Sequence, residues 1–308
     1  MHHNDIHYKK VIAMVDDALN FVEIVEEHPC PNGSEWVIYQ YKRTSPLILS
    51  AWRNGNKHHF VTKIGKEKLN LVPSLSAAGI EEVYIENDKV HIVYAGLAGG
   101  GVGTELRKGA ENVIEVNILE KGGGSKIGRA EVVTPKMEKV IIGIDDTDTK
   151  EKGATWVLAH EIGLEVEKHK LGYYLDHTIV QLYPGNPNKT QNCVSIALSF
   201  AVYLEYKYKI DKFVKKLLKE RSLSDNTAMA VYYGLFPSKS MKLFTMKAKK
   251  KMVTLEEAKS IALRNNIKII PVTGEGGIIG AVAALGLAEH HDLAPKLCED
   301  IEMKKTII

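Results

Sequence analysis

The stretch Lys139-Val-Ile-Ile-Gly-Ile-Asp-Asp-Thr-Asp-Thr149 decides how the rest of the chain is interpreted. Its apolar, mostly β-branched residues 140–144 predict a short buried strand, and recurring apolar residues over 156–164 predict a helix after it. Three carboxylates lie between the two elements: Asp145, Asp146 and Asp148. Carboxylates in such a position often bind a hard cation, and magnesium needs only one or two of them when phosphate oxygens supply other ligands. The alternative is a solvated acidic turn, because Asp favours turns and helix caps.

The composition is that of a globular protein, and 308 residues leave room for two domains. A formal net charge of +3 neither requires nor excludes a nucleic-acid partner. The three cysteines form no Cys-x-x-Cys pair, which argues against a cysteine-based zinc ribbon and favours free thiols in a reducing cytoplasm. No apolar run is long enough to span a bilayer, and the N-terminus lacks the apolar core of a signal peptide. We therefore predict a cytoplasmic protein without a membrane partner.

The first part of the chain, residues 1–138, is predicted to be a strand-rich α+β module. The early spacing of apolar residues within 8–27 suits a helix, whereas 21–25 suits a strand equally well. Three segments rich in β-forming residues follow, over 36–41, 47–52 and 59–62. Two hairpins are predicted around the turn dipeptides Asn54-Gly55 and Asn87-Asp88.

Two glycine-rich loops complete this module, Gly96–Gly103 and Gly122–Gly128. Four cations lie near them in the sequence: Arg107, Lys108, Lys126 and Arg129. Backbone N–H groups in such loops can bind an anion, and a flexible turn or a linker is the alternative. A short helix is predicted over 105–110, and Pro135 is predicted to mark a boundary before the aspartate strand.

The second part, residues 139–308, alternates predicted strands and helices. Strands are predicted over 178–183, 194–202 and 267–272, and helices over 208–218, after Thr254 and over 281–288. Thr254 and Glu257 have the spacing of a capping box. The basic run Lys247–Lys251 predicts an exposed loop or, alternatively, a nucleic-acid contact. The glycine turn Gly274–Gly280 can donate N–H groups to a phosphate, or it can serve close helix packing.

Four motifs, in this order, resemble the catalytic core of TiaS, the archaeal tRNA-Ile agmatinylcytidine synthetase family. They are Ile144-Asp-Asp-Thr-Asp148, Pro187-Asn-Lys-Thr-Gln-Asn192, Ser224-Asp-Asn-Thr-Ala-Met229 and Gly277-Ile-Ile-Gly-Ala-Val-Ala-Ala-Leu-Gly286. In that family the core is an atypical kinase-like domain that uses ATP and magnesium. The resemblance implies that the three aspartates bind metal and phosphates and that Thr155 is the phosphorylated threonine. Here Gly153-Ala-Thr-Trp156 replaces the family's Gly-Cys-Thr-Thr.

The whole chain is also similar to methanogenesis marker protein 11, a family from methane-producing archaea that joins a TiaS-like core to its own N-terminal module. The similar segments are Trp36-Val-Ile-Tyr39, Ser45-Pro-Leu-Ile-Leu-Ser50, Leu69-Asn-Leu-Val-Pro-Ser74, Tyr94-Ala-Gly-Leu97, Ile127-Gly-Arg-Ala130 and His177-Thr-Ile-Val-Gln-Leu-Tyr-Pro184. We expect the chain to lack the OB-fold and zinc ribbon with which TiaS reads tRNA. A tRNA partner is therefore possible but not the expected one.

These observations predict an α+β protein with a strand-rich N-terminal module, 1–138, for acceptor recognition and a TiaS-like, kinase-like α/β core, 139–308. The predicted activity is Mg-ATP-dependent phosphotransfer or ligation associated with methanogenesis, in which Asp145 or Asp146 also serves as base. The acceptor is predicted to be a protein or an anionic small molecule. Further nucleotide contacts are assigned to Lys189, Thr190, Asn192, Gly274, Gly276, Gly277 and Gly280. The alternatives are a nucleotide-binding assembly or chaperone factor for the methane-forming machinery and an RNA-modifying enzyme.

Overall fold

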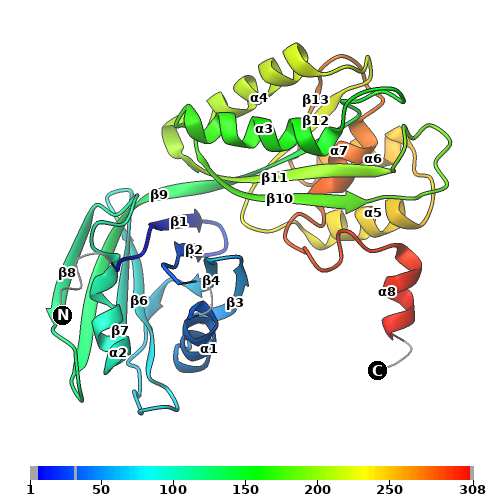
Figure 1. Cartoon of the computed structure of the whole chain (residues 1–308). Coiled ribbons are helices and arrows are strands. Elements are labelled where there is room, and N and C mark those ends of the chain that lie inside the picture. The colour runs from blue at the N-terminus through cyan, green and yellow to red at the C-terminus, as the bar shows by residue number, and fades with distance from the viewer. Residues whose placement is uncertain (1–5, 31–32, 306–308) are drawn as a thin grey trace. The chain divides into compact units, whose positions relative to one another are not determined.

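The computed structural model describes residues 6–30 and 33–305. The chain forms two compact units, Met1–Met137 and Glu138–Ile308, and each contains strands packed against helices (Figure 1). The predicted α+β class, with a strand-rich N-terminal module and an α/β core, is therefore confirmed. Within the described ranges, no helix has both the length and the apolar character that crossing a membrane would require.

The first unit is built mainly from antiparallel hairpins. Its elements are β1 Lys10–Asp16, β2 Phe21–Glu27, α1 Ser34–Thr44, β3 Ile48–Asn54, β4 Lys57–Lys63, β5 Gly65–Lys66, β6 Ala78–Glu86, β7 Lys89–Leu97, α2 Gly99–Gly103, the 3-10 turn η1 Glu105–Arg107, β8 Glu115–Glu120 and the first part of β9 Ile127–Asp145. The strands follow the order β3-β4-β2-β1-β9-β7-β6-β5, and β8 also pairs with β9. Residues from these strands and from α1 enclose one apolar core.

Local turn chemistry predicted the hairpins of this unit correctly. β3 and β4 pair around Asn54-Gly55, where Gly55 has a φ of 60°, and β6 and β7 pair around Asn87-Asp88, with φ values of 49° and 55°. Two other predictions are wrong. The early helix within 8–27 is the hairpin β1–β2, and the β-forming residues 36–41 lie in helix α1. The predicted helix over 105–110 is shortened to η1.

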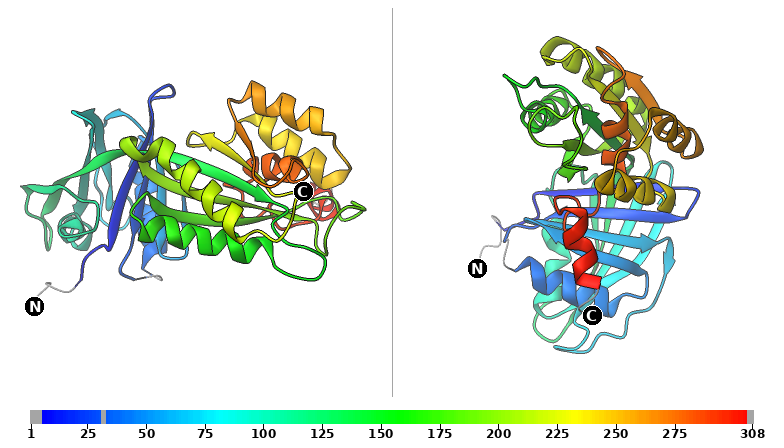
Figure 2. Two further views of the ribbon diagram at one scale, coloured as in Figure 1. Left: turned by 90° about the horizontal axis from the view of Figure 1, so that it is seen from above. Right: turned by 90° about the vertical axis from the view of Figure 1, so that its right-hand side faces the viewer.

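The second unit has three layers, with helices on both faces of a sheet. Its further elements are α3 Thr155–Lys168, β10 Tyr173–Gln181, β11 Val194–Tyr203, the 3-10 turn η2 Leu204–Tyr206, α4 Lys207–Arg221, β12 Ala228–Tyr233, α5 Lys239–Lys250, α6 Leu255–Arg264, β13 Lys268–Pro271, α7 Ile278–Leu285 and α8 Cys298–Lys305. The strand order is β10-β11-β9-β12-β13. Helices α3 and α4 lie together on one face, while α5, α6 and α7 cover the other (Figure 2).

The end of β9 is the centre of this unit, because its side chains alternate between the two faces. Val140, Ile142 and Ile144 pack toward α3 and α4, whereas Ile141 packs toward α5, α6 and α7. The boundary between the two units, Met137–Glu138, lies close to Pro135, but it does not interrupt the strand, since β9 continues from Ile127 to Asp145. Pro135 is accommodated because its neighbour across the ladder to β7 is Lys89, at the end of that strand.

Candidate functional site

A cavity of about 1040 Å³ lies at the carboxyl end of β9, and the three aspartates of the opening motif line it. Ligand cavities in proteins commonly measure about 300–1,000 Å³, so this one has room for a molecule as large as a nucleoside triphosphate. Its other walls come from the start of α3, the loop between β10 and β11, the loop before β12, the end of α5 and the start of α7. The start of α3, the loop between β10 and β11 and the start of α7 carry residues that the sequence assigned to the site, whereas the end of α5 was not expected there.

Asp145 lies against the first turn of α7. A Cβ atom added to Gly280 would lie only 1.6 Å from the Asp145 carboxylate oxygen Oδ2, so this helix position has no space for any side chain. Earlier in β9, a Cβ on Gly143 would lie 1.9 Å from the carbonyl oxygen of Ala281. These two glycines allow β9 and α7 to approach closely, and this packing fixes the position of the aspartates relative to the start of α7.

Asp146 turns the chain out of the strand with a φ of 54°, a left-handed conformation that Asp tolerates better than most residues. The Thr227 hydroxyl donates a 2.7 Å hydrogen bond to the Asp146 carbonyl and so holds this turn. Two residues later, the Thr190 hydroxyl donates to the Asp148 carboxylate at 3.3 Å. The acidic motif is thus ordered by contacts from two other loops.

The negative charge of the motif is poorly compensated. Removal from water raises the pKa of Asp145 well above its ordinary value, and the charges of Asp146 and Asp148 raise it further. The pKa of Asp146 is raised as well, first by removal from water and then by Asp148. A cation bound among these carboxylates would relieve both effects, which is the electrostatic condition for a metal or metal-nucleotide site.

Carboxylate oxygens are the donor type that magnesium prefers, so the residues fit this ion chemically. Among residues 6–30 and 33–305, however, no three His, Cys, Asp or Glu side chains converge closely enough to hold a metal by themselves. The predicted set of three aspartate ligands is therefore not assembled as a closed cluster. Magnesium commonly binds through one or two carboxylates and completes its shell with water and phosphate oxygens, and this arrangement suits such a shared site.

Thr155 is the first residue of α3 and lies in the cavity wall, although its side chain is only 5% exposed. Its hydroxyl oxygen accepts hydrogen bonds from the Thr147 backbone N–H at 3.3 Å and from the Thr147 hydroxyl at 3.1 Å. These contacts tie the start of α3 to the aspartate turn. A reaction on this hydroxyl would require it to turn toward the cavity.

The seven residues assigned to the nucleotide divide into two groups. Five of them line the cavity with the aspartates: Lys189, Thr190, Asn192, Gly276 and Gly280. The Lys189 ammonium donates to the Pro184 carbonyl in its own loop at 2.5 Å. Gly274 and Gly277 serve close packing instead, because added Cβ atoms would lie 2.2 Å from the Asp225 carbonyl oxygen and 2.7 Å from that of Asp145. Gly274 and Gly277 thus have the packing role that was the alternative interpretation of this turn, whereas the phosphate-binding role of Gly276 and Gly280 stays a prediction.

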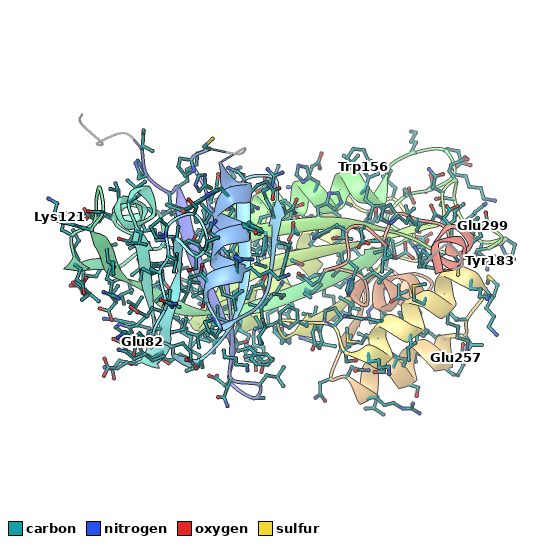
Figure 3. All side chains as sticks on the ribbon, turned by 90° about the horizontal axis from the view of Figure 1, so that it is seen from below. Glu82, Lys121, Trp156, Tyr183, Glu257 and Glu299 are labelled. Carbon is teal, nitrogen blue, oxygen red and sulfur yellow. The ribbon has the colours of Figure 1, made fainter. Side chains whose placement is uncertain are left out.

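Sequence reasoning missed Trp156, which also lines the cavity and is 48% exposed on α3 (Figure 3). Its ring stacks on that of His177 with a centroid distance of 6.4 Å, and His177 stacks in turn on His160 at 5.6 Å. The signal was present in the sequence, since Trp156 stands where the resemblance expects a threonine. An exposed indole beside a cavity can stack on a planar ligand.

The predicted basic patch Lys247–Lys251 does not form a continuous surface. Lys247 pairs with Glu257, the capping-box residue of α6, which Figure 3 labels. Lys249 is buried, and its ammonium donates to the carbonyls of Gln181 at 2.7 Å and Ala294 at 2.8 Å. Most of the run belongs to α5 and is not an exposed loop, whereas Lys251 lines the aspartate cavity.

The four cations near the glycine loops of the first unit also differ from expectation. Arg107 is fully buried and pairs with Glu26, with its Nε 2.5 Å from Glu26 Oε1. Arg129 pairs with Glu81 and Glu120, each at 2.7 Å. Two of the predicted anion-binding groups are therefore neutralised by carboxylates. The other two, Lys108 and Lys126, are exposed.

One relative is similar over almost the whole chain. The uncharacterized protein MJ0921 of Methanocaldococcus jannaschii is 89% identical over 298 residues, which cover 97% of this chain and 99% of that protein. The chain belongs to the family of MJ0921.

The site itself lies in a segment with known relatives. Residues 141–208, which include the aspartates, Thr155 and the loop before β11, match the family described as the TiaS TCKD domain. The tRNA 2-agmatinylcytidine synthetases TiaS of Pyrococcus horikoshii and Thermococcus sibiricus are 31% and 32% identical over 150 and 155 residues, or 47% and 49% of this chain. The alignments cover 35% of each synthetase, so this chain spans about a third of their length.

Solved TiaS structures show a weaker overall likeness. A crystal structure of TiaS in complex with its isoleucine tRNA and ATP is 25% identical with a TM-score of 0.43, and the alignment covers 48% of this chain and 36% of TiaS. A TiaS complex with the same tRNA, AMPCPP and agmatine gives a TM-score of 0.42 over the same shares. Within this chain, the match to the TiaS TCKD domain is confined to residues 141–208.

Proposed function

We propose that this protein of the MJ0921 family is a magnesium- and ATP-dependent phosphotransferase or ligase-like enzyme. One observation carries the proposal: three aspartates, two of which raise the pKa of the third, line a nucleotide-sized cavity in a segment that matches the TiaS TCKD domain. The named relatives of this domain are synthetases, a class that couples bond formation to nucleotide cleavage. We assign the chemistry to the second unit and the choice of acceptor to the first.

The aspartates would share one cation with the phosphates of ATP. Magnesium, when bound, neutralises phosphate charge and favours in-line displacement. Asp145 is held beneath Gly280, and Asp148 is held by Thr190, so both are fixed before a ligand arrives. Lys251 lines the same cavity and brings a positive charge near the nucleotide.

Thr155 is the proposed phosphoacceptor. Its Oγ1 would form a bond to the terminal phosphorus while the bond from that phosphorus to the leaving ADP oxygen breaks. The hydroxyl proton would pass to the carboxylate of Asp145 or Asp146. Peptide mass spectrometry after incubation with Mg-ATP should find phosphate on Thr155 and none in the Thr155→Val variant. Phosphate only at other residues would leave Thr155 a structural hydroxyl.

Calorimetry with Mg-ATP tests the proposal most directly. Asp145→Asn and Asp148→Asn should each weaken Mg-ATP binding at least about tenfold, because a carboxylate–cation contact is lost. Asp292→Asn is the matched control, since Asp292 is exposed and lies outside the cavity wall. Unchanged affinity in both cavity variants, or equal loss in the control, would remove the aspartates from nucleotide binding.

RNA modification is the second candidate, because the relatives of the domain are tRNA-modifying synthetases. The dispersed lysines of α5 argue against it, since RNA binding needs several phosphate contacts on one surface. Transfer of agmatine to unmodified tRNA-Ile by the purified protein with ATP would establish this candidate. Strongly salt-dependent RNA binding without transfer would indicate a different RNA substrate.

Two further predictions are an assembly factor that binds nucleotide and an association with methanogenesis. ATP hydrolysis without any acceptor product would favour a nucleotide-binding assembly factor. The association with methanogenesis stays a prediction from the sequence motifs. Untargeted mass spectrometry of metabolites and proteins after deletion of the gene should show an unmodified acceptor that accumulates, and methane-forming proteins among the affected species would support the association.

A further inference from the structure

The first unit contains a cavity of its own, with a volume of about 630 Å³. Its walls include the rings of Tyr8, Trp36 and Tyr41, and no Lys, Arg, Asp or Glu is among the described residues that line it. Trp36 is 47% exposed, so part of its ring is available to a ligand. This cavity differs in kind from the acidic one in the second unit.

A buried ion pair makes the aromatic wall rigid. The Arg107 guanidinium donates to both carboxylate oxygens of Glu26, at 2.5 and 2.9 Å, and its carbon lies 4.3 Å from the Tyr8 ring centroid. Its Nη2 also donates to the Tyr41 hydroxyl at 3.3 Å, and its Nη1 donates to the Gly103 carbonyl at 3.1 Å. Arg107 therefore joins two wall residues to helix α2, and its own charge is neutralised by Glu26.

Helix α2 presents bare backbone to the cavity. Gly99 and Gly103 line it, and a Cβ atom added at either position would meet no atom within 4 Å. Gly100, between them, also lines the cavity, and an added Cβ there would lie 3.0 Å from Cβ of Ala78, another wall residue. Because these three positions carry no side chain, a flat molecule can approach the peptide groups closely.

One polar group completes the wall. His28 lines the cavity, and its Nδ1 is engaged with the backbone of Cys30, at 3.0 Å from the N–H and 2.7 Å from the carbonyl oxygen. Its Nε2 has no hydrogen-bond partner among the described residues. Behind it, the fully buried His58 stacks on His28 with a centroid distance of 4.9 Å. This stacking fixes the plane in which His28 can offer Nε2 to a ligand.

We propose that this cavity binds a neutral, planar aromatic molecule of one or two rings that carries one polar group for His28. A charged ligand would lose its hydration without gaining an opposite charge, whereas a neutral ring gains contact with aromatic and glycine surfaces. The inference goes beyond the proposed ATP chemistry and does not rest on it.

The test measures the affinity of the full chain for 2-naphthol by calorimetry. This molecule is neutral, has two fused aromatic rings and carries one hydroxyl. Naphthalene-2-sulfonate is the matched charged probe and should bind at least about tenfold more weakly. Trp36→Ala should weaken 2-naphthol binding about tenfold or more by removing a stacking surface. Tyr39→Ala is its control, because Tyr39 lies on the same helix, is 60% exposed and does not line the cavity. Gly103→Leu should abolish binding by filling the cavity from its open side.

Absence of 2-naphthol binding to the wild type, equal binding of the sulfonate, or unchanged binding in Trp36→Ala would each overturn the proposal. The Gly103→Leu result counts only if the unfolding transition of this variant matches that of the wild type. If it does not, the Trp36→Ala result tests the proposal. Mg-ATP affinity should be unchanged in all these variants. A wild-type protein that binds 2-naphthol but not Mg-ATP would overturn the proposed function and leave the proposal for this cavity intact.

Discussion

The Asp145 carboxylate favours Mg-ATP binding but lowers the stability of the ligand-free protein. Its carboxylate is held beneath α7, and removal from water together with the like charges of Asp146 and Asp148 raises its pKa. Without a cation, the ionised form destabilises the folded state. Asp145→Asn should therefore raise the free energy of unfolding of the ligand-free protein at pH 7 by about 0.5–2 kcal/mol, although it weakens Mg-ATP binding. Denaturant unfolding without magnesium measures this, and a less stable variant would contradict it.

His58 gives the first unit a defined response to acid. It is fully buried without a hydrogen bond to either ring nitrogen, and removal from water lowers its pKa from 6.5 to about 4, with Glu26 opposing the shift and His28, Arg107 and His59 adding to it. The unfolded chain takes up this proton near pH 6.5, whereas the folded chain does so only near pH 4. Stability should thus fall as the pH drops through this range, by at most about 3 kcal/mol from His58.

His58→Phe should remove that part of the acid sensitivity. Denaturant unfolding at pH 7 and pH 4.5 gives the difference for each protein. His7→Phe is the control, because His7 is exposed. The explanation fails if the wild type and His58→Phe lose equal stability between the two pH values.

Trp156 offers an optical test of the proposed nucleotide site. It lines the aspartate cavity with almost half of its side chain exposed, so a bound nucleotide should change its surroundings. In a Trp36→Phe, Trp52→Phe protein, where Trp156 is the remaining tryptophan, Mg-ATP should alter the fluorescence and magnesium with inorganic triphosphate should not. Adding Asp145→Asn should move the response to higher ATP concentrations. Equal responses to ATP and triphosphate would mean that the base does not contact Trp156.

At the scale of elements, the contact of α7 with β9 determines the geometry of the site. Gly280→Ala would place a methyl group on the Asp145 carboxylate, so the helix or the side chain must shift. We expect a loss of about 1–3 kcal/mol in unfolding free energy together with weaker Mg-ATP binding. Gly99→Ala is the matched control, since its methyl group meets no atom within 4 Å and alanine favours a helix. Wild-type affinity in Gly280→Ala would show that Asp145 can leave its position without consequence.

The elements that the sequence predicted well are those determined locally. The hairpin at Asn54-Gly55 and the capping box of Thr254 with Glu257 depend on neighbours in the chain, and both are present. Helix α1 was missed because packing overrides the β-propensity of its residues: Ser34, Val37, Tyr41 and Thr44 form one buried face at helical spacing. The hairpin β1–β2 was missed because its residues 11–15 are buried without alternation, a pattern that does not distinguish helix from strand.

For the candidate site, too, the sequence predicted the features that depend on neighbours in the chain and not those that depend on distant residues. The aspartates follow a strand in the sequence, so their clustering could be foreseen. The contacts that order them come from Thr190 and Thr227, which are distant in the chain. The neutralisation of Arg107 by Glu26 is equally non-local, and for this reason the sequence overestimated the positive charge of the first unit.

At the scale of the whole molecule, β9 belongs to both units. Its last residues lie between two neighbouring strands of the second unit. Residues 140–145 pair with β12, and β11 borders the same strand on its other side. A protein of residues 138–308 should therefore fold and bind Mg-ATP within about threefold of the full chain, but it should lack acceptor chemistry. Circular dichroism establishes folding, and calorimetry measures binding. A folded core without nucleotide affinity would show that the first unit contributes to the ATP site.

The contact of Gly143 with Ala281 also limits how the gene can vary. Every missense change of a glycine codon adds a side chain, and at position 143 the first new atom would lie 1.9 Å from a carbonyl oxygen. We therefore expect mostly synonymous changes there in proteins that keep this fold, whereas positions 99 and 103 admit alanine without a clash. A substitution at 143 that persists should be accompanied by a shift of β9 or α7, and with it a shift of the aspartates.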